Sequence, residues 1–229
     1  MRKTIIREFI VLVFIKLNDM KIIDNYKHLP IGLYEQIQEI NRQDDIDDLH
    51  KQVLIIAVLT GKEEEEIYSL PIEEYTELAK KSLFLTREYE GDVRVAQVYK
   101  VKGWELVPVE DYRNINTAQY IDFQTFSKAG EEKMVEILST LLVPKGKKYN
   151  QGYDVLQLQQ DLRDNLSLAD ALTLFAFFFV KFQSLIKTSL TYSKSEAKKI
   201  QNKQMREQMM AKVAMVEELM RSGGDGLRM

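Results

Sequence analysis

Five side chains near residue 47 form the chain's mixed carboxylate–histidine cluster: Asp44, Asp45, Asp47, Asp48 and His50. Asp47 and His50 are three residues apart and share a helical face, so a weak metal site is chemically conceivable. The calcium-loop pattern with its turn glycine is missing. Carboxylates are also favoured in the first turn of a helix by the helix dipole. We therefore interpret the cluster as a helix start and expect neither a metal site nor a cofactor.

The chain offers little material for catalysis. It has two histidines and no cysteine, which excludes disulfides, thiolate zinc sites and a cysteine nucleophile. Gly146 and Gly152 lack the spacing of a phosphate-binding loop. The net charge of −3 gives no chain-wide electrostatic footprint for nucleic acid. We expect a protein that is not an enzyme and whose main partner is not nucleic acid.

The most distinctive exposed segment is expected between Pro144 and Asp154. Three lysines and two tyrosines occur together there, a combination that can hold a peptide or single-stranded nucleic acid. A solvated loop explains the same residues more simply, because lysines are common on any surface. The candidate partner-binding residues of this loop are Lys145, Lys147, Lys148, Tyr149 and Tyr153.

A second candidate surface lies on a long polar helix expected from Ser193 to Arg221. Residues 193–212 carry six basic side chains against two glutamates, a formal charge of +4. A basic amphipathic helix can bind acidic partners or a groove, while docking within the chain or coiled-coil self-association explains it equally well. No aromatic residue lies in its apolar stripe, which argues against a membrane surface. The stripe consists of Met205, Met209, Val213, Val216 and Met220.

The hydrophobic pattern predicts a mainly α fold. Apolar residues at helical spacing predict a helix at 33–40, and a second one capped by Asp44 and Asp45. The second helix should turn Ile46, Leu49, Val53, Ile56 and Leu59 inward. Further helices are expected from Glu63, from Pro71 to Leu85, and over 117–127, 130–143, 155–164 and 168–190. Alternation over 93–109 about Lys102-Gly103 predicts a β-hairpin.

The helix over 168–190 is expected in the core or in a subunit interface. Ser167 and Asp170 approximate a capping box at its start. Residues 172–180 are apolar on all sides, yet the apolar segment is too short to span a membrane.

The two helical regions resemble each other. Tyr34 and Gln38 match Tyr120 and Gln124 at an offset of 86 residues, and Ser-Leu pairs at 69–70 and 167–168 are expected to start helices. A repeated helical unit is typical of contact scaffolds. The sequence thus predicts a duplicated helical module with an inserted β-hairpin and a long C-terminal helical arm. The expected boundaries are an N-terminal extension at 1–27, module one at 28–90, the hairpin at 91–114, module two at 115–192, and the arm with its tip at 193–229.

The N-terminal extension carries a short apolar run from Phe9 to Ile15. Lys16 and Asp19 occupy the positions where a signal peptide would need small residues. We interpret the run as part of the core or as sequence ahead of a start at Met20.

Four segments together resemble virion morphogenesis proteins of tailed bacteriophages, of the kind described as tail assembly chaperone-like. They are residues 29–34, 52–61, 119–124 and 142–146, and the resemblance covers about residues 28–190. It implies a largely helical protein without enzymatic activity, acting in the host cytoplasm.

The resemblance implies that the partners are phage structural proteins, such as the tape-measure protein or a tail component. Two alternatives stay open: a permanent virion component at the head–tail connector or ring, and an enzyme or nucleic-acid-binding regulator. Of these, a permanent component would also be found in the virion. A homo-oligomer is a further candidate for the state of the chain.

Overall fold

The computed structural model describes residues 21–91, 94–111 and 114–199, together with 201, 203, 205, 207–211 and 214. Within these ranges, the side chains of Glu131, Phe179 and residues 182–189 lie outside the description. The fold is mainly α with a small antiparallel sheet, which confirms the predicted fold class. Two compact units divide the chain: an N-terminal unit of Met1–Tyr89 and Gln159–Ala171, and a C-terminal unit of Glu90–Leu158 and Leu172–Met229. Residues 159–171, expected in module two, thus belong to the N-terminal unit.

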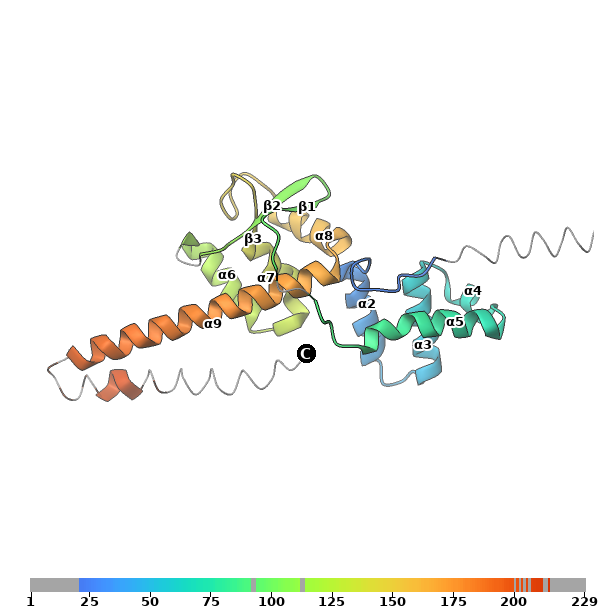
Figure 1. Cartoon of the computed structure of the whole chain (residues 1–229), viewed down its shortest axis with the longest axis horizontal. Helices are drawn as coiled ribbons and strands as arrows, with labels where there is room; N and C mark the ends of the chain where they lie inside the picture. The colour runs from blue at the N-terminus through green and yellow to red at the C-terminus, as the bar shows by residue number, and fades with distance from the viewer. Residues whose placement is uncertain are drawn as a thin grey trace, which may run out of the picture. The chain divides into compact units, whose positions relative to one another are not determined.

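The N-terminal unit is built mostly from short helices (Figure 1). They are α2 (Ile31–Arg42), α3 (Asp48–Thr60), α4 (Glu64–Tyr68), α5 (Ile72–Ser82) and the 3₁₀ helix η1 (Leu83–Thr86). Helix α3 packs against α2, α4 and α5. Its buried residues Val53 and Ile56 form a core with Ile67 and Leu78. Leu49 is 62% exposed, so its predicted inward position is wrong.

The ends of these helices follow local capping chemistry. Asp47, not Asp44 or Asp45, is the N-cap of α3, and its carboxylate accepts from the His50 N–H at 2.9 Å. Ser69 is the C-cap of α4, so the predicted Ser-Leu helix start at 69–70 is wrong. Pro71 stops α4 from continuing and is the N-cap of α5.

Two distant segments complete the N-terminal unit. Residues 21–29 pack into it, since the Ile23 N–H donates to the Leu59 carbonyl and Leu29 is fully buried. The Leu168 N–H donates to the Leu29 carbonyl at 2.7 Å, beside a bridge between Pro30 and Ser167. The segment expected as an extension is therefore part of a folded unit from residue 21 onward.

The C-terminal unit contains a three-stranded antiparallel sheet in the order β1-β2-β3. Its strands are β1 (Tyr99–Val101), β2 (Trp104–Pro108) and β3 (Leu142–Pro144). Lys102 and Gly103 form the predicted turn with positive φ values of 40° and 86°. The hairpin prediction is confirmed there, although β1 is shorter than expected. Residues 142–143, expected at the end of a helix, instead belong to β3, which pairs Val143 with Val107.

Helices cover the rest of this unit: α6 (Thr117–Ser127), η3 (Gly130–Lys133) and α7 (Met134–Leu141). Helix α6 packs against α7, and α7 leads into β3 (Figure 1). Helices α8 (Val155–Asn165) and α9 (Leu168–Lys199) contribute residues to both units. The long α9 continues through Ser193, so the structure has no break where module two was expected to meet the arm.

The phenylalanine-rich part of α9 buries one side, while Val180 is 60% exposed, so the expected burial on all sides is confirmed only in part. Leu174 and Phe178 are 0% and 3% exposed, and Phe175 and Phe177 are half-buried. Ser167 caps the helix because its Oγ accepts from the Asp170 N–H at 3.1 Å. Its hydroxyl also donates to the Asp170 carboxylate at 2.8 Å.

The duplication is only partly visible in the burial pattern. Ile37 of α2 and Phe123 of α6 are separated by the expected 86 residues and are 1% and 6% exposed. A duplicated module would pack both matched tyrosines, Tyr34 and Tyr120, against its apolar helix, but Tyr120 is 48% exposed. The superposition of the two modules stays a prediction.

Candidate functional site

A groove of about 620 Å³ lies in the C-terminal unit, beside the loop singled out in the sequence. Its floor includes Val107 and Val143, which pair across β2 and β3. Val107 is 36% exposed because alternate residues of β2, such as Leu106, point to the opposite, buried face. The groove thus offers a small apolar surface on an otherwise polar edge of the unit.

One wall of the groove is the turn that carries the candidate lysines. The Lys145 N–H donates to the Glu105 carbonyl at 2.8 Å, and the Lys147 N–H donates to the Pro144 carbonyl at 2.9 Å. Gly146 between them has a φ of 77°, a conformation that glycine adopts without strain. These bonds fix the backbone, while the side chains of Lys145, Lys147 and Lys148 are exposed.

Tyr149 does not lie on the surface as expected. Its side chain is 4% exposed, and its hydroxyl donates to the Asp122 carboxylate of α6 at 2.8 Å. Burial and, next, the Asp122 carboxylate raise the pKa of Tyr149 well above its ordinary value. Asn116, the N-cap of α6, donates from its amide to the Tyr149 carbonyl at 3.4 Å. The correction is that Tyr149 anchors the loop and has no ring face for a ligand to stack on.

Tyr153 also serves the structure of the loop. It does not line the groove, and its ring meets the Trp104 ring edge-on at 6.2 Å between centroids. Burial raises its pKa, and its hydroxyl oxygen accepts from the Asn150 N–H at 3.4 Å. The structure therefore brings four of the five candidate loop residues to the groove and places the fifth against the hairpin.

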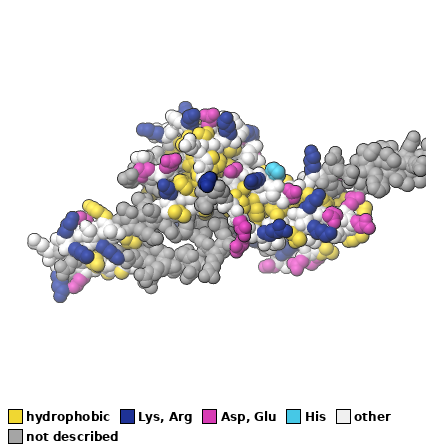
Figure 2. All heavy atoms as spheres, viewed as in Figure 1, with side chains coloured by type: hydrophobic (Ala, Val, Ile, Leu, Met, Phe, Trp, Pro, Cys, Tyr) yellow, Lys and Arg dark blue, Asp and Glu magenta, His cyan; other side chains and the backbone are white. Residues whose placement is uncertain are grey.

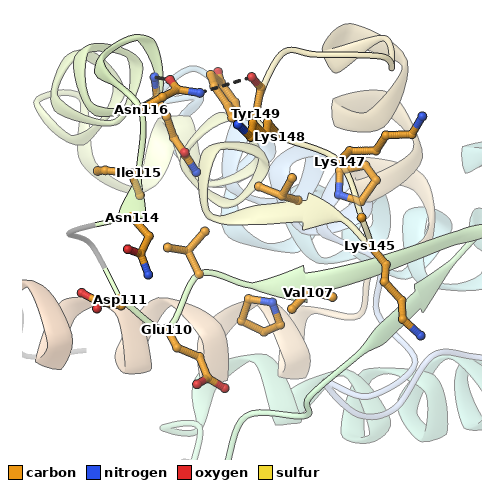
Figure 3. A pocket seen from close by; sticks show the side chains of 16 residues that line it. Val107, Glu110, Asp111, Asn114, Ile115, Asn116, Lys145, Lys147, Lys148 and Tyr149 are labelled. Atoms are coloured by element: carbon orange, nitrogen blue, oxygen red, sulfur yellow. Dashed lines mark hydrogen bonds between the residues drawn. The ribbon is translucent and has the colours of Figure 1, made fainter.

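The opposite wall was missed in the sequence. It follows β2 and bears Glu110, Asp111, Asn114 and Asn116 beside the apolar Ile115. Figure 3 shows the side chains of Lys145 and Lys147 extending from one rim and those of Glu110 and Asp111 lying at the other. The sequence pointed to this wall only through the helix that starts after Asn116. That signal does not reveal the contact of Asn116 with Tyr149, which lies 33 residues later.

The second candidate surface is only partly described. Met205 is 62% exposed and Met209 is half-buried, both in helical backbone. Val213, Val216 and Met220 lie outside the described residues.

Residues of the carboxylate–histidine cluster cap α3 and connect it to α4. Asp47 caps α3, and His50 Nε2 lies 3.0 Å from Glu64 Oε1 of α4. Among the described residues, no group of three or more possible metal ligands comes together. In the same part of the chain, no helix is both long and apolar enough to cross a membrane.

The chain was compared with protein-family models, with curated proteins and with solved structures, and no match was found in any of the three.

The groove has the chemistry of a binding surface. The lysine amines on one rim can pair with carboxylates of a ligand, and the carboxylates on the other rim can pair with its basic groups. The two valines of the floor can contact an apolar side chain.

Proposed function

We propose that this chain is a non-enzymatic assembly protein of a tailed bacteriophage that binds structural proteins, such as a tail or tape-measure component, during morphogenesis in the host cytoplasm. The resemblance in sequence supplies the biological setting. The observation that carries the binding role is the groove, with its apolar floor between a lysine rim and a carboxylate rim.

Charged rims on either side of an apolar floor favour one orientation of a bound segment. Complementary charges set register and rate of association, while the apolar contact supplies affinity. A volume of about 620 Å³ accommodates a few side chains, which suits reversible capture of a short segment. Reversible capture is what a protein that hands over a tail component requires.

Two other functions would use the same surface differently. A permanent component of a head–tail connector or ring would hold its neighbour through the groove in the finished particle. A nucleic-acid-binding regulator would use Lys145, Lys147 and Lys148 on phosphates. The burial of Tyr149 weighs against single-stranded nucleic acid, because base stacking needs an accessible aromatic face.

Site-directed photocross-linking tests the proposal. A photoreactive residue at Val107 reports on the groove, and the same residue at the exposed Thr76 of α5 is the matched control. During phage production, we expect a tail or tape-measure protein to be cross-linked from position 107 and not from position 76. Equal cross-linking of a tail or tape-measure protein from both positions, or cross-linking from position 107 mainly to nucleic acid, would contradict the proposal.

A further inference from the structure

A second apolar surface lies on the N-terminal unit and contains none of the residues that line the groove. Leu49 at the start of α3, Tyr68 at the end of α4 and Ile72 at the start of α5 are 62%, 56% and 75% exposed. The helices that carry them pack against one another, and large exposed apolar side chains on neighbouring helices are typical of an interaction site. We call these three residues, together with the carboxylates of residues 44–77, the acidic face.

Contacts among α3, α4 and α5 hold this face together. The His50 ring meets the Tyr68 ring at 6.1 Å between centroids, and the Tyr75 hydroxyl donates to Gln52 at 2.9 Å. Leu49 is three residues before Gln52, and Ile72 is three before Tyr75, so each shares a helical side with a bonded residue. Leu49 and Ile72 therefore lie on the helix sides that carry the hydrogen bond between α3 and α5.

The face carries a strong negative charge. Residues 44–77 contain eleven carboxylates and two lysines, a formal charge of −9, while the whole chain has −3. Figure 2 shows Asp and Glu side chains along the outer edges of this unit. Most of these carboxylates are exposed, among them Asp45, Asp48, Glu65 and Glu73. Such a field attracts a cationic partner and rejects an anionic one.

The opposite charge is concentrated at the C-terminal end of the same chain. Residues 193–212 have a formal charge of +4, and Lys198 and Lys199 are exposed at the end of α9. Tyr192 and Met205 are 66% and 62% exposed in the same stretch. Figure 2 shows Lys and Arg side chains together with apolar ones at this end. The basic arm thus offers both features that complement the acidic face.

We propose that the basic arm of one copy binds the acidic face of a second copy. Charge complementarity and the apolar residues on both surfaces select this occupant. Binding of the arm to the face of its own chain would leave the chain monomeric, and sedimentation distinguishes that outcome from the association of two copies.

The proposed interface is head-to-tail. Each copy that uses its arm still has an unused acidic face, and each copy that uses its face still has an unused arm. Such interfaces generate rings or open chains of copies, unlike a two-fold dimer. The inference does not depend on the groove, so it can fail while the proposed function holds.

Sedimentation of the full chain over a range of concentrations tests the inference. At about 50 mM salt we expect the average mass to rise with concentration, and at about 500 mM salt the association to weaken at least about tenfold. An arm variant, Lys198→Glu with Lys199→Glu, and a face variant, Glu65→Lys with Glu73→Lys, each place like charges opposite one another and should lose at least about tenfold in affinity. Lys100→Glu with Lys128→Glu, at exposed positions of the C-terminal unit, is the charge-matched control and should associate like wild type.

An equimolar mixture of the arm and face variants gives the sharpest result. The arm variant keeps its acidic face and the face variant keeps its arm, so the pair should form a heterodimer that does not grow further. Circular dichroism should report equal helix content in every variant. A chain that stays monomeric at all concentrations, an association that ignores both charge reversals, or a mixture that stays monomeric would each overturn the inference.

Discussion

The Tyr149 hydroxyl donates a 2.8 Å hydrogen bond to the Asp122 carboxylate, and this contact ties the groove-forming loop to α6. The Asn116 side-chain amide also donates a hydrogen bond to the Tyr149 carbonyl of this loop. Because Asn116 caps α6 as well, one end of that helix and one wall of the groove are fixed by the same few side chains.

Removing the Tyr149 hydroxyl should loosen this connection. Tyr149→Phe leaves the half-buried Asp122 carboxylate without its donor, and we expect the free energy of unfolding to fall by about 1–2 kcal/mol. Urea unfolding measures the change. Tyr192→Phe is the control, because Tyr192 is 66% exposed and its loss should change stability by less than about 0.5 kcal/mol. Equal effects of the two substitutions would show that the Asp122 contact contributes nothing.

Tyr149 should also affect how the free energy of unfolding declines at alkaline pH. The folded state raises the pKa of Tyr149 above its ordinary value of 10.0, so its contribution is complete below pH 10.0 and declines as the pH rises beyond it. A single such group lowers stability by up to about 1.4 kcal/mol per pH unit in that window. Urea unfolding between neutral pH and pH 11 should show that the free energy of unfolding declines less steeply for Tyr149→Phe than for wild type. The difference in slope should correspond to the titration of about one tyrosine. Parallel curves would contradict the assignment.

Gly32 marks a close approach between α2 and α8. A Cβ atom there would lie 2.9 Å from Arg163 Cγ and 3.1 Å from the Arg163 carbonyl oxygen. Gly32→Ala should therefore destabilise the fold by about 1–3 kcal/mol, although alanine normally favours a helix over glycine. Thermal or urea unfolding measures this, with Thr125→Ala at an exposed position of α6 as the control. A Gly32→Ala variant more stable than wild type would show that the helices separate easily.

Phe178 should be the most sensitive of the α9 phenylalanines whose side chains the structure describes. It is 3% exposed and meets the half-buried Phe177 ring edge-on at 5.4 Å between centroids. We expect Phe178→Ala to lower the free energy of unfolding by about 3–5 kcal/mol, and Phe177→Ala to have a smaller effect. A Phe178→Ala variant that melts like wild type but no longer assembles would place this side chain in a subunit interface instead.

Local signals predicted the elements of the fold well. Turn chemistry located the Lys102-Gly103 hairpin turn, and helical spacing located α6 and α8 to within a residue of their observed bounds. These features depend on neighbours within a few residues, which the sequence displays directly.

Contacts between distant segments were harder to predict. Strand β3 exists because Val143 pairs with Val107, a partner 36 residues earlier that no local pattern reveals. Tyr149 was expected on the surface because a tyrosine among lysines suggests a loop, but its hydrogen-bond acceptor, Asp122, is 27 residues away. The same limit applies to the groove, of which the sequence indicated one wall and missed the other.

Quantitative mass spectrometry of assembly intermediates and of purified mature particles tests the central claim most directly. The proposed assembly role predicts that the chain co-purifies with a tail or tape-measure protein in the intermediates and is absent from mature virions. Charge reversals at Lys145 and Lys147 on the groove rim should reduce that co-purification, while the control reversals at Lys100 and Lys128 should not. A fixed stoichiometric amount in mature virions, or no structural protein bound at any stage, would contradict the account.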